Sequence, residues 1–319
     1  MARYLVTGGA GFIGSHLVEA LLVEGHAVRV LDDLSNGKRD RLPRQAEFIR
    51  ADITAREVVE RAFEGIDGCY HLAAIASVVD GPRGWRQTHE VNLAGTINVF
   101  NAARQACNRR QISVVYASTA AVYGDGGVGP VGEEARTAPL SAYGADKLAC
   151  EFHARVAGAV HGVPTLGLRF FNIYGPRQDP RSPYSGVIAI FADRLQRGEP
   201  VEIFGDGGQV RDFTFIGDAV LALLHSMPAA ATAAPVFNIC TGKGTTVHSL
   251  ARTIAGLCRT KLVVSSRAPR CGELRISIGD PRRAAERLGF RARTSLADGL
   301  AVTLDALGRC TPVSARVVA

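Results

Sequence analysis

Residues 3–33 have the sequence RYLVTGGAGFIGSHLVEALLVEGHAVRVLDD, and this segment decides the expected fold of the whole chain. The apolar run 4–6 has the length of a strand and stops at the glycine-rich turn 7–11. Between residues 12 and 22 the apolar side chains recur at helical spacing, and the run 28–31 returns to the pattern of a strand. The order strand, glycine turn, helix, strand predicts half of a nucleotide-binding βαβ unit.

The glycines of this turn have the spacing of a phosphate-binding turn. Gly8, Gly11 and Gly14 fit GxxGxxG, and Gly9, Gly11 and Gly14 fit GxGxxG. A pyrophosphate approaches the backbone N–H groups at the N-terminus of the helix, where any Cβ would be in the way. Asp32 ends the next strand, where a carboxylate accepts hydrogen bonds from ribose hydroxyls and repels a 2′-phosphate. NAD is therefore favoured over NADP.

Composition limits the class of protein. The chain has 319 residues, 47% of them hydrophobic, enough for one large domain or two unequal ones. No run approaches the roughly 18 apolar residues of a membrane span, and no signal sequence precedes the first strand, so we expect a cytoplasmic protein. The seven cysteines form no CxxC pair, which predicts reduced thiols and no metal site.

The charge of the chain is mostly due to arginine. The net charge is +7, and 33 of the 37 basic residues are arginine. They form no block of like charge, and only 7% of the residues are aromatic, so a nucleic-acid-binding surface is not expected. The arginines suit an anionic small-molecule substrate, although composition bias is the default interpretation for most of them.

Apolar runs and helical patterns alternate along the first half of the chain. We expect further strands at 48–49, 70–74, 114–117 and 164–171, and long helices at 86–107 and 141–161. This alternation predicts an α/β fold with a doubly wound, parallel, Rossmann-type sheet whose ligands lie at the carboxyl ends of the strands. After Gly175 the pattern becomes short and irregular, so we divide the chain into an NAD-binding domain, 1–175, and a mainly smaller substrate-binding lobe, 176–319.

A reacting group is suggested by Tyr143 and Lys147, which lie four residues apart on one face of the second long helix. A phenol has a pKa of about 10, and lowering it to about 7 requires about 4 kcal/mol, which a lysine and a positively charged nicotinamide favour. Ser118 and Thr119 end the preceding strand, and we expect Thr119 to hydrogen-bond the reacting oxygen while Tyr143 moves its proton. We also expect Lys147 to hold the nicotinamide ribose. The alternative is an exposed surface pair beside a helix-capping threonine.

Taken together, the motifs resemble those of a known family. They are TGGAGFIG, the pair Asp32-Asp33, HLAA at 71–74, Asn92, STAAVYG at 118–124, YGADK at 143–147, RFFNIYGPRQ at 169–178 and GQVRDF at 208–213. From residue 3 to about 300 the chain resembles the extended short-chain dehydrogenase/reductases of the NAD-dependent epimerase/dehydratase family, and more narrowly the nucleotide-sugar 4-epimerases that act on UDP-galactose or UDP-N-acetylglucosamine. The resemblance implies tightly bound NAD, a UDP-sugar substrate, and a homodimer built on the helices near 86–107 and 143–161.

The resemblance also implies roles for individual residues. Cofactor contacts are implied for Gly8, Gly11, Phe12, Ile13, Gly14, Asp32, Asp33, Asn36, Gly37, Asp52, Ile53, Leu72, Ala73, Ala74, Asn92, Ala117 and Phe170. The implied catalytic set is Ser118, Thr119, Tyr143 and Lys147, of which the last two also contact NAD. Substrate contacts are implied for Ser77, Thr119, Asn172, Gly186, Val187, Ile203, Arg211, Arg270, Glu273 and Ser277. Arginine suits a diphosphate because its fork donates two hydrogen bonds. Phe170 departs from a common tyrosine, and neighbouring groups are expected to line the nicotinamide.

Two positions narrow the reaction. Ala120 and Ala121 stand where relatives that eliminate water or decarboxylate the sugar carry acids, and methyl groups transfer no protons. Reversible oxidation at C4 through a transient 4-keto sugar remains, with NAD supplying the redox step and no net redox change. Ser277 matches a gatekeeper position, where a small side chain leaves room for an N-acetyl group. UDP-N-acetylglucosamine and UDP-N-acetylgalactosamine are therefore predicted substrates beside UDP-glucose and UDP-galactose.

Other functions stay open. A UDP-glucuronate 4-epimerase would use Arg181 or Arg275 to meet the carboxylate. A nucleotide-sugar reductase or dehydratase of the same fold would need exchangeable cofactor or additional acids. A non-catalytic NAD-sensing protein is disfavoured because Tyr143 and Lys147 are both present. The sequence leaves the preferred UDP-sugar pair open.

Overall fold

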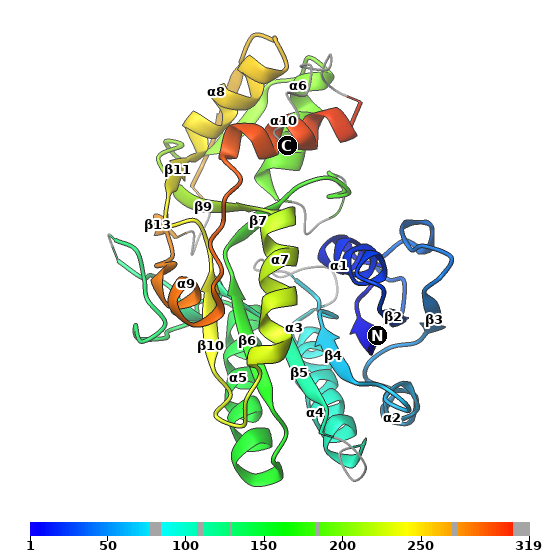
Figure 1. The fold of residues 1–319 in the computed structure, drawn as a ribbon. Helices are drawn as coiled ribbons and strands as arrows, with labels where there is room; N and C mark the ends of the chain where they lie inside the picture. The colour runs from blue at the N-terminus through cyan, green and yellow to red at the C-terminus, as the bar shows by residue number, and fades with distance from the viewer. Residues whose placement is uncertain are drawn as a thin grey trace.

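The computed structural model describes residues 1–76, 84–106, 111–127, 129–180, 182, 186–269 and 274–308. Its largest element is a seven-stranded sheet of parallel strands in the order β10-β6-β5-β4-β1-β2-β3 (Figure 1). The strands are β1 (Arg3–Thr7), β2 (Ala27–Asp32), β3 (Glu47–Arg50), β4 (Gly68–His71), β5 (Ser113–Thr119), β6 (Thr165–Phe170) and β10 (Val236–Ile239). The prediction of a doubly wound parallel sheet is confirmed.

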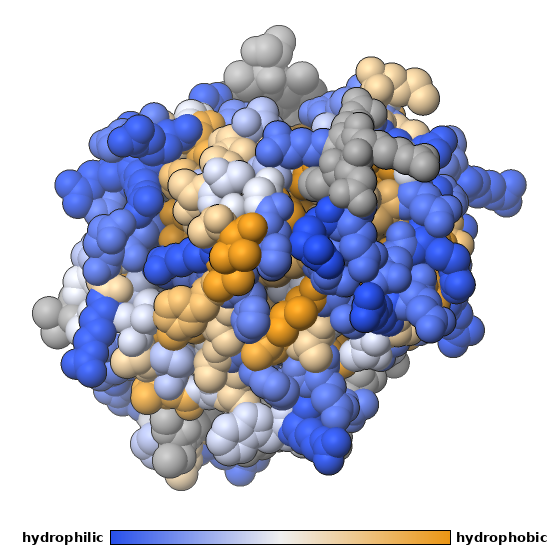
Figure 2. Space-filling view, turned by 90° about the horizontal axis from the view of Figure 1, so that it is seen from below, coloured by the Kyte–Doolittle hydropathy of each residue, from blue (hydrophilic) through white to orange (hydrophobic). Residues whose placement is uncertain are grey.

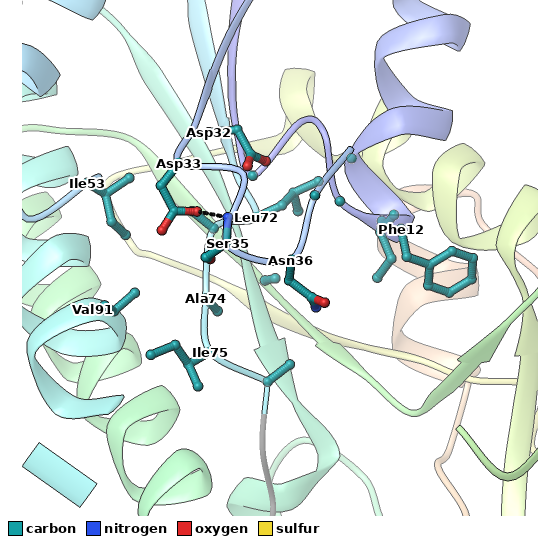
Figure 3. A pocket seen from close by; sticks show the side chains of 18 of the residues that line it. Phe12, Asp32, Asp33, Ser35, Asn36, Ile53, Leu72, Ala74, Ile75 and Val91 are labelled. Carbon is teal, nitrogen blue, oxygen red and sulfur yellow. Dashed lines mark hydrogen bonds between the residues drawn. The ribbon is translucent and has the colours of Figure 1, made fainter. Parts of the chain in front are cut away.

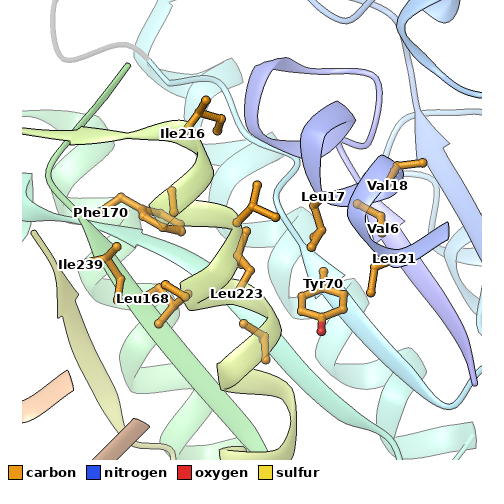
Figure 4. Close-up of a cluster of buried hydrophobic side chains, with 14 of the residues drawn as sticks. Val6, Leu17, Val18, Leu21, Tyr70, Leu168, Phe170, Ile216, Leu223 and Ile239 are labelled. Carbon is orange, nitrogen blue, oxygen red and sulfur yellow. The ribbon is translucent and has the colours of Figure 1, made fainter. Parts of the chain in front are cut away.

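Helices cover both faces of this sheet. Side chains alternate along a strand, so Val6 packs on one face with Leu17 and Leu223, while Leu5 packs on the other face (Figure 4). Burying one such leucine contributes about 1.5–3 kcal/mol. The first face is covered by α1 (Phe12–Val23), α7 (Ile216–Ser226) and α9 (Arg282–Leu288), and the second by α2 (Arg56–Ala62), α4 (Gly95–Ala106) and α5 (Ala142–His161).

A smaller lobe begins just beyond the end of β6 (Figure 1). It has one sheet in the order β11-β9-β13, with β7 paired to β9, and a second sheet of β12 and β8. Its separate core includes Phe191, Leu250 and Leu300. The elements are β7 (Asn172–Tyr174), α6 (Val187–Gln196), β8 (Val201–Phe204), β9 (Val210–Phe215), β11 (Gly244–Thr246), α8 (Val247–Leu257), β12 (Val264–Arg267), β13 (Ile276–Ser277) and α10 (Leu296–Ala306).

The chain returns to the large sheet after entering the smaller lobe. β10 pairs with β6, and α7 packs its apolar side on the first face of the same sheet. Both elements lie beyond residue 175, so a single cut there does not follow the sheet. The division into 1–175 and 176–319 stays a prediction about the lobes.

Two predicted elements differ in extent. The helix predicted over 86–107 consists of α3 (Gly84–His89), a π-helical turn η2 (Glu90–Ala94) and α4, and residue 107 lies outside the described residues. At the π turn the carbonyl of Asn92 accepts hydrogen bonds from the Thr96 hydroxyl (2.5 Å) and the Cys150 thiol (3.2 Å). The strand predicted over 70–74 ends at His71, because residues 72–76 leave the sheet to line a cavity. In the described part of the chain, no helix is both long and apolar enough to cross a bilayer.

Candidate active site

A cavity of about 260 Å³ lies at the carboxyl ends of β1, β2 and β4 (Figure 3). Strand order reverses between β1 and β4, which is where ligands bind in sheets of this kind. The cavity is lined by most of the predicted cofactor residues: Gly8, Gly11, Phe12, Ile13, Gly14, Asp32, Asp33, Asn36, Gly37, Asp52, Ile53, Leu72, Ala73, Ala74 and Ala117. The structure therefore brings these residues together around one space.

The glycine turn leaves its backbone open to this cavity. Gly8 has φ +69°, and a Cβ there would lie 2.6 Å from the backbone nitrogen of Ala73. A Cβ on Gly14 would collide with the carbonyl oxygen of Gly8. Gly11 is the N-cap of α1, and no side chain caps this helix start. The first N–H groups of α1 are thus available to an anion such as a pyrophosphate.

Asp32 and Asp33 line the cavity at the end of β2 (Figure 3). The Asp32 carboxylate is 7% exposed and accepts hydrogen bonds from the backbone nitrogens of Ala10 (2.9 Å) and Leu34 (2.8 Å). Burial raises the pKa of Asp32, and these backbone hydrogen bonds oppose the rise. An ionised carboxylate has about four acceptor positions, so lone pairs remain for a ribose hydroxyl.

Asn92 does not line the cavity, which differs from the role that the resemblance implied. Its side chain is fully buried, accepts a hydrogen bond from Ile75 N (2.8 Å) and donates one to Ile75 O (3.0 Å). Ile75 and its neighbours form a wall of the cavity (Figure 3). Asn92 thus shapes the cavity through the loop, and the π turn brings its side chain to that loop.

His71 supports the same wall from inside the sheet. Its ring is 1% exposed and lies between Thr7 Oγ1 (2.7 Å from Nδ1) and Thr96 Oγ1 (2.9 Å from Nε2). Because the Thr96 hydroxyl donates to a carbonyl, Nε2–H donates to Thr96 and Nδ1 accepts from Thr7. Burial, and then the charge of Lys147, lower the pKa of His71 to about 3, so this histidine is neutral.

The three predicted reacting side chains meet where β5 and α5 approach each other. Thr119 ends β5, and its hydroxyl accepts a hydrogen bond from Ala121 N (3.2 Å), which caps the short 3-10 helix η3 (Ala120–Tyr123). Tyr143 and Lys147 lie one turn apart on α5, and Thr119 acts on the Tyr143 phenol so as to lower its pKa. The cavity lining includes Ala117, two residues before Thr119. Thr119, Tyr143 and Lys147 are themselves not among the residues that line the cavity.

The pKa of Tyr143 differs from the sequence-based expectation. Burial raises it to about 12, while the hydrogen bond with Thr119 lowers it in part. Lys147 is 1% exposed, and burial lowers its own pKa. The expected lowering by Lys147 is not found in the protein alone, because desolvation of the phenol dominates.

Two further predicted residues face away from the cavity. Ser118 is 1% exposed, and its hydroxyl donates to Glu151 Oε1 (2.6 Å) rather than pointing toward a substrate. Phe170 is 7% exposed and packs in the core with Leu168 and Ile216 (Figure 4). Neither side chain lines the cavity, because both point into packed faces of the sheet.

The predicted substrate residues are spread over the smaller lobe. Arg211 on β9 lies opposite Ser277 on β13, and Asn172 begins β7, which also pairs with β9. Gly186 is the N-cap of α6 and Val187 its first residue. Ile203 is 2% exposed in the core of the lobe, so its side chain does not face a substrate. The remaining predicted residues lie outside the described residues: Ser77, Arg270, Glu273 and, for the glucuronate alternative, Arg181.

The other arginine considered for a carboxylate substrate is engaged elsewhere. Arg275 donates to both carboxylate oxygens of Asp206, at 2.6 and 3.0 Å. This pair satisfies its guanidinium with a neighbour in the same lobe. No observation on Arg275 favours glucuronate.

Sequence reasoning missed the segment that closes one side of the cavity. Arg41 also lines the cavity and donates to the carbonyl of Arg177 (2.8 Å), while Arg177 pairs with Glu19 of α1 (2.6 Å). Lys38 pairs with Asp179 (3.1 Å). The available signal was the GPRQ sequence at 175–178, which the resemblance included without a role. Within the described residues, no cluster of three or more His, Cys, Asp or Glu side chains could hold a metal ion.

Comparisons with known proteins agree with this architecture. Residues 4–240 match the NAD dependent epimerase/dehydratase family. A UDP-glucose 4-epimerase of Mycolicibacterium smegmatis is 37% identical over 95% of this chain and 97% of its own length. The crystal structure of Thermus thermophilus UDP-glucose 4-epimerase in complex with NAD is 37% identical, covers 96% of this chain and 99% of its own, and has a TM-score of 0.89. The UDP-N-acetylglucosamine 4-epimerase of Methanobrevibacter ruminantium, in complex with UDP-N-acetylmuramic acid, is 30% identical and covers 96% and 98% of the two chains, with a TM-score of 0.89. The chain belongs to the NAD-dependent epimerase/dehydratase family.

Proposed function

We propose that the protein is an NAD-dependent 4-epimerase of UDP-hexoses. The observation that carries the proposal is that Tyr143 and Lys147 lie one turn apart on α5 with Thr119 acting on the phenol, in a chain whose first strand ends in a glycine turn with no room for Cβ atoms. A hydroxyl, a phenol and a buried ammonium suit proton transfer at an alcohol carbon. Membership of the family and the names of the similar proteins support the same reaction.

The residues of the cavity fit NAD. Gly8 and Gly14 leave no room for a Cβ, and the uncapped start of α1 offers N–H groups to the pyrophosphate. Asp32 holds the ribose hydroxyls and repels a 2′-phosphate, which favours NAD over NADP. NAD held by the glycine turn and Asp32 would supply a reversible hydride acceptor for C4 of the sugar.

The chain's own residues move the proton. Tyr143 accepts the proton of the C4 hydroxyl and returns it to the 4-keto sugar after the sugar has turned over, while Thr119 hydrogen-bonds the same oxygen. Lowering the pKa of Tyr143 from about 12 to 7 requires about 7 kcal/mol. A bound, positively charged nicotinamide would add favourable charge that the protein alone, including Lys147, does not supply. The reaction therefore begins only with the cofactor in place.

The substrate class follows from the residues around the sugar. Ala120 and Ala121 carry no acid for elimination, which leaves epimerisation. Arg211 is the described arginine proposed to hold the diphosphate. Ser277 is half-buried on β13, and its small side chain leaves space for an N-acetyl group. UDP-glucose and UDP-galactose, and also their N-acetylated counterparts, are the proposed substrates.

The proposed active form is a homodimer in the cytoplasm. Apolar side chains stay exposed on the two long helices: Ile97 on α4, and Phe152, Val156 and Val160 on α5. α4 and α5 contact each other, and their exposed apolar side chains are proposed to form the dimer interface. Seen from below, the molecule shows apolar side chains grouped among charged ones near the middle of the view (Figure 2). Free thiols at Cys69, Cys150 and Cys240 suit a reducing compartment.

A panel of UDP-sugars tests the proposed function. The purified protein is incubated with UDP-glucose, UDP-galactose, UDP-N-acetylglucosamine, UDP-N-acetylgalactosamine and UDP-glucuronate, and the products are separated by chromatography. We expect the 4-epimer of at least one neutral sugar. No epimer from any of the five would overturn the proposal. Size-exclusion chromatography with light scattering tests the dimer, and Val156→Asp is expected to weaken it.

A further inference from the structure

A row of buried polar side chains crosses the large sheet behind the reacting groups. Ser118 on β5 lies in register with Arg169 on β6, and Arg169 lies in register with Asn238 on β10. All three are 2% exposed or less. In parallel sheets such positions are occupied mainly by apolar residues, so a polar row needs partners and a reason.

At one end, the row is hydrogen-bonded to a side chain of α5. Arg169 donates from Nε and Nη2 to the two carboxylate oxygens of Glu151, at 2.9 and 2.6 Å, and Ser118 donates to the same carboxylate at 2.6 Å. Glu151 is 2% exposed and lies one turn after Lys147, two turns after Tyr143. The two-point ion pair therefore joins the helix of the reacting phenol to β6, and the Ser118 hydrogen bond joins the same helix to the end of β5.

The other end of the row holds η3, the short helix that Thr119 caps. Arg169 Nη1 donates to the hydroxyl of Tyr123 (2.9 Å), and this hydroxyl donates to Asn238 Oδ1 (2.6 Å). The Arg169 guanidinium also lies over the Tyr123 ring, 4.9 Å from its centre. Tyr123 is the last residue of η3, and Thr119 is its N-cap. Both ends of η3 are thus held by side chains.

We propose that Ser118, Arg169 and Asn238, with Glu151 and Tyr123, are positioning residues that fix the end of β5, which carries Thr119, relative to α5, which carries Tyr143. The residues of the row are not among those that line the cavity, and the row acts through α5 and η3. Buried ion pairs add little stability compared with apolar packing, so stability alone does not explain this one. A positioning role explains this ion pair, because a displacement of about 1 Å between reacting groups costs about 100-fold in rate. The inference rests on the proposed function only for the identity of the reaction.

Two substitutions that each remove one hydroxyl group, and one matched control, test the positioning role. Tyr123→Phe removes the hydroxyl that joins Arg169 to Asn238 and keeps the ring, while Ser118→Ala removes the link from β5 to Glu151. The control is Tyr116→Phe, on the same face of β5, since the Tyr116 hydroxyl is buried without a hydrogen-bond partner among the described residues. All three variants keep every charge in place.

We expect Tyr123→Phe and Ser118→Ala to lower kcat at least about tenfold, with KM and bound NAD within twofold of the unaltered protein. Tyr116→Phe is expected to keep kcat within twofold. If either test variant keeps kcat within twofold, or loses activity only through KM, the positioning role is overturned. Should Tyr123→Phe fail to fold, Ser118→Ala decides.

A second measurement does not need a substrate. The ultraviolet absorbance of tyrosinate is titrated in each NAD-loaded variant, and the contribution of residue 143 is obtained by difference from the same protein carrying Tyr143→Phe. Because Thr119 lowers the pKa of Tyr143, we expect this pKa to rise in Tyr123→Phe and Ser118→Ala and to stay in Tyr116→Phe. An unchanged pKa in both test variants would contradict the positioning role. If the unaltered protein epimerises no UDP-sugar, the proposed function fails, and this titration alone decides the inference.

Discussion

Two strand-to-helix junctions of the large sheet show opposite designs. Between β1 and α1 the turn is bare: Gly11 caps the helix without a side chain, and Cβ atoms have no room at Gly8 or Gly14. Between β5 and η3 the junction is held by side chains: Thr119 caps the short helix, and Tyr123 at its end is hydrogen-bonded on both sides. A junction that binds a ligand with backbone must keep side chains away, whereas one that aims a hydroxyl needs them.

The largest effect is expected where the supported junction loses its central charge. Arg169→Gln leaves the Glu151 carboxylate buried without its ion pair, which costs about 3–5 kcal/mol in free energy of unfolding. Urea unfolding measures it. The matched control is Arg283→Gln, whose partner Glu134 is 91% exposed, and which is expected to cost about 0–1 kcal/mol. Equal losses in the two variants would show that burial of the pair does not matter.

At the bare junction, one methyl group is expected to abolish tight binding of the cofactor. Gly14→Ala places a Cβ against backbone atoms of Gly8 and Gly9, which cannot move without opening the turn. We expect the Kd for NAD to rise about 100-fold, equivalent to about 2.7 kcal/mol, in isothermal titration of the cofactor-free protein. Gly256→Ala, on α8 with open space around it, is the control. NAD affinity that survives Gly14→Ala would contradict the role of the turn.

The wall beside the bare turn is expected to weaken in acid. The pKa of His71 is about 3 in the folded protein and about 6.5 when unfolded, so the unfolded chain binds the extra proton between these values. The contribution of neutral His71 to the free energy of unfolding is then fully present above pH 6.5 and falls by about 2 kcal/mol between pH 6.5 and pH 5. Urea unfolding at several pH values measures the slope, and His71→Asn is expected to reduce it. A slope that His71→Asn leaves intact would assign the acid sensitivity to other groups.

The smallest effect is expected at the exposed rim of the cofactor cavity. Lys38→Gln removes the pair with Asp179, whose side chains are 50% and 26% exposed. Exposed pairs contribute about 0–1 kcal/mol, so the Kd for NAD is expected to stay within about threefold. Isothermal titration of the Lys38→Gln and Gly14→Ala variants with NAD under the same conditions compares their Kd values. A Kd that rose as far as in Gly14→Ala would mean that closure by 177–179, rather than the bare turn, dominates NAD binding.

The features that could be predicted from the sequence are those that depend on short sequence motifs. The glycine turn, the spacing of Tyr143 and Lys147, and the hydroxyl of Thr119 depend on a single turn, helix or strand end. The strands and helices that carry them belong to one parallel sheet and its covering helices, as the alternation of strands and helices leads one to expect.

The supporting side chains were not predictable, because they depend on register and orientation. Arg169 meets Ser118 and Asn238 only through the pairing of three strands far apart in sequence. Ser118 and Asn92 were given catalytic and cofactor roles by resemblance, yet they bond to Glu151 and Ile75. A single sequence shows the residue types at these positions and not the faces into which they point.

The central claim is that Tyr143 moves the C4 proton while NAD rests on the glycine turn. It is tested most directly by rapid mixing of the NAD-loaded protein with a UDP-hexose, following the near-ultraviolet absorbance of the bound cofactor. The unaltered protein is expected to give a transient change that a Tyr143→Phe variant, with NAD still bound, does not give. An equal transient in both proteins would contradict the claim.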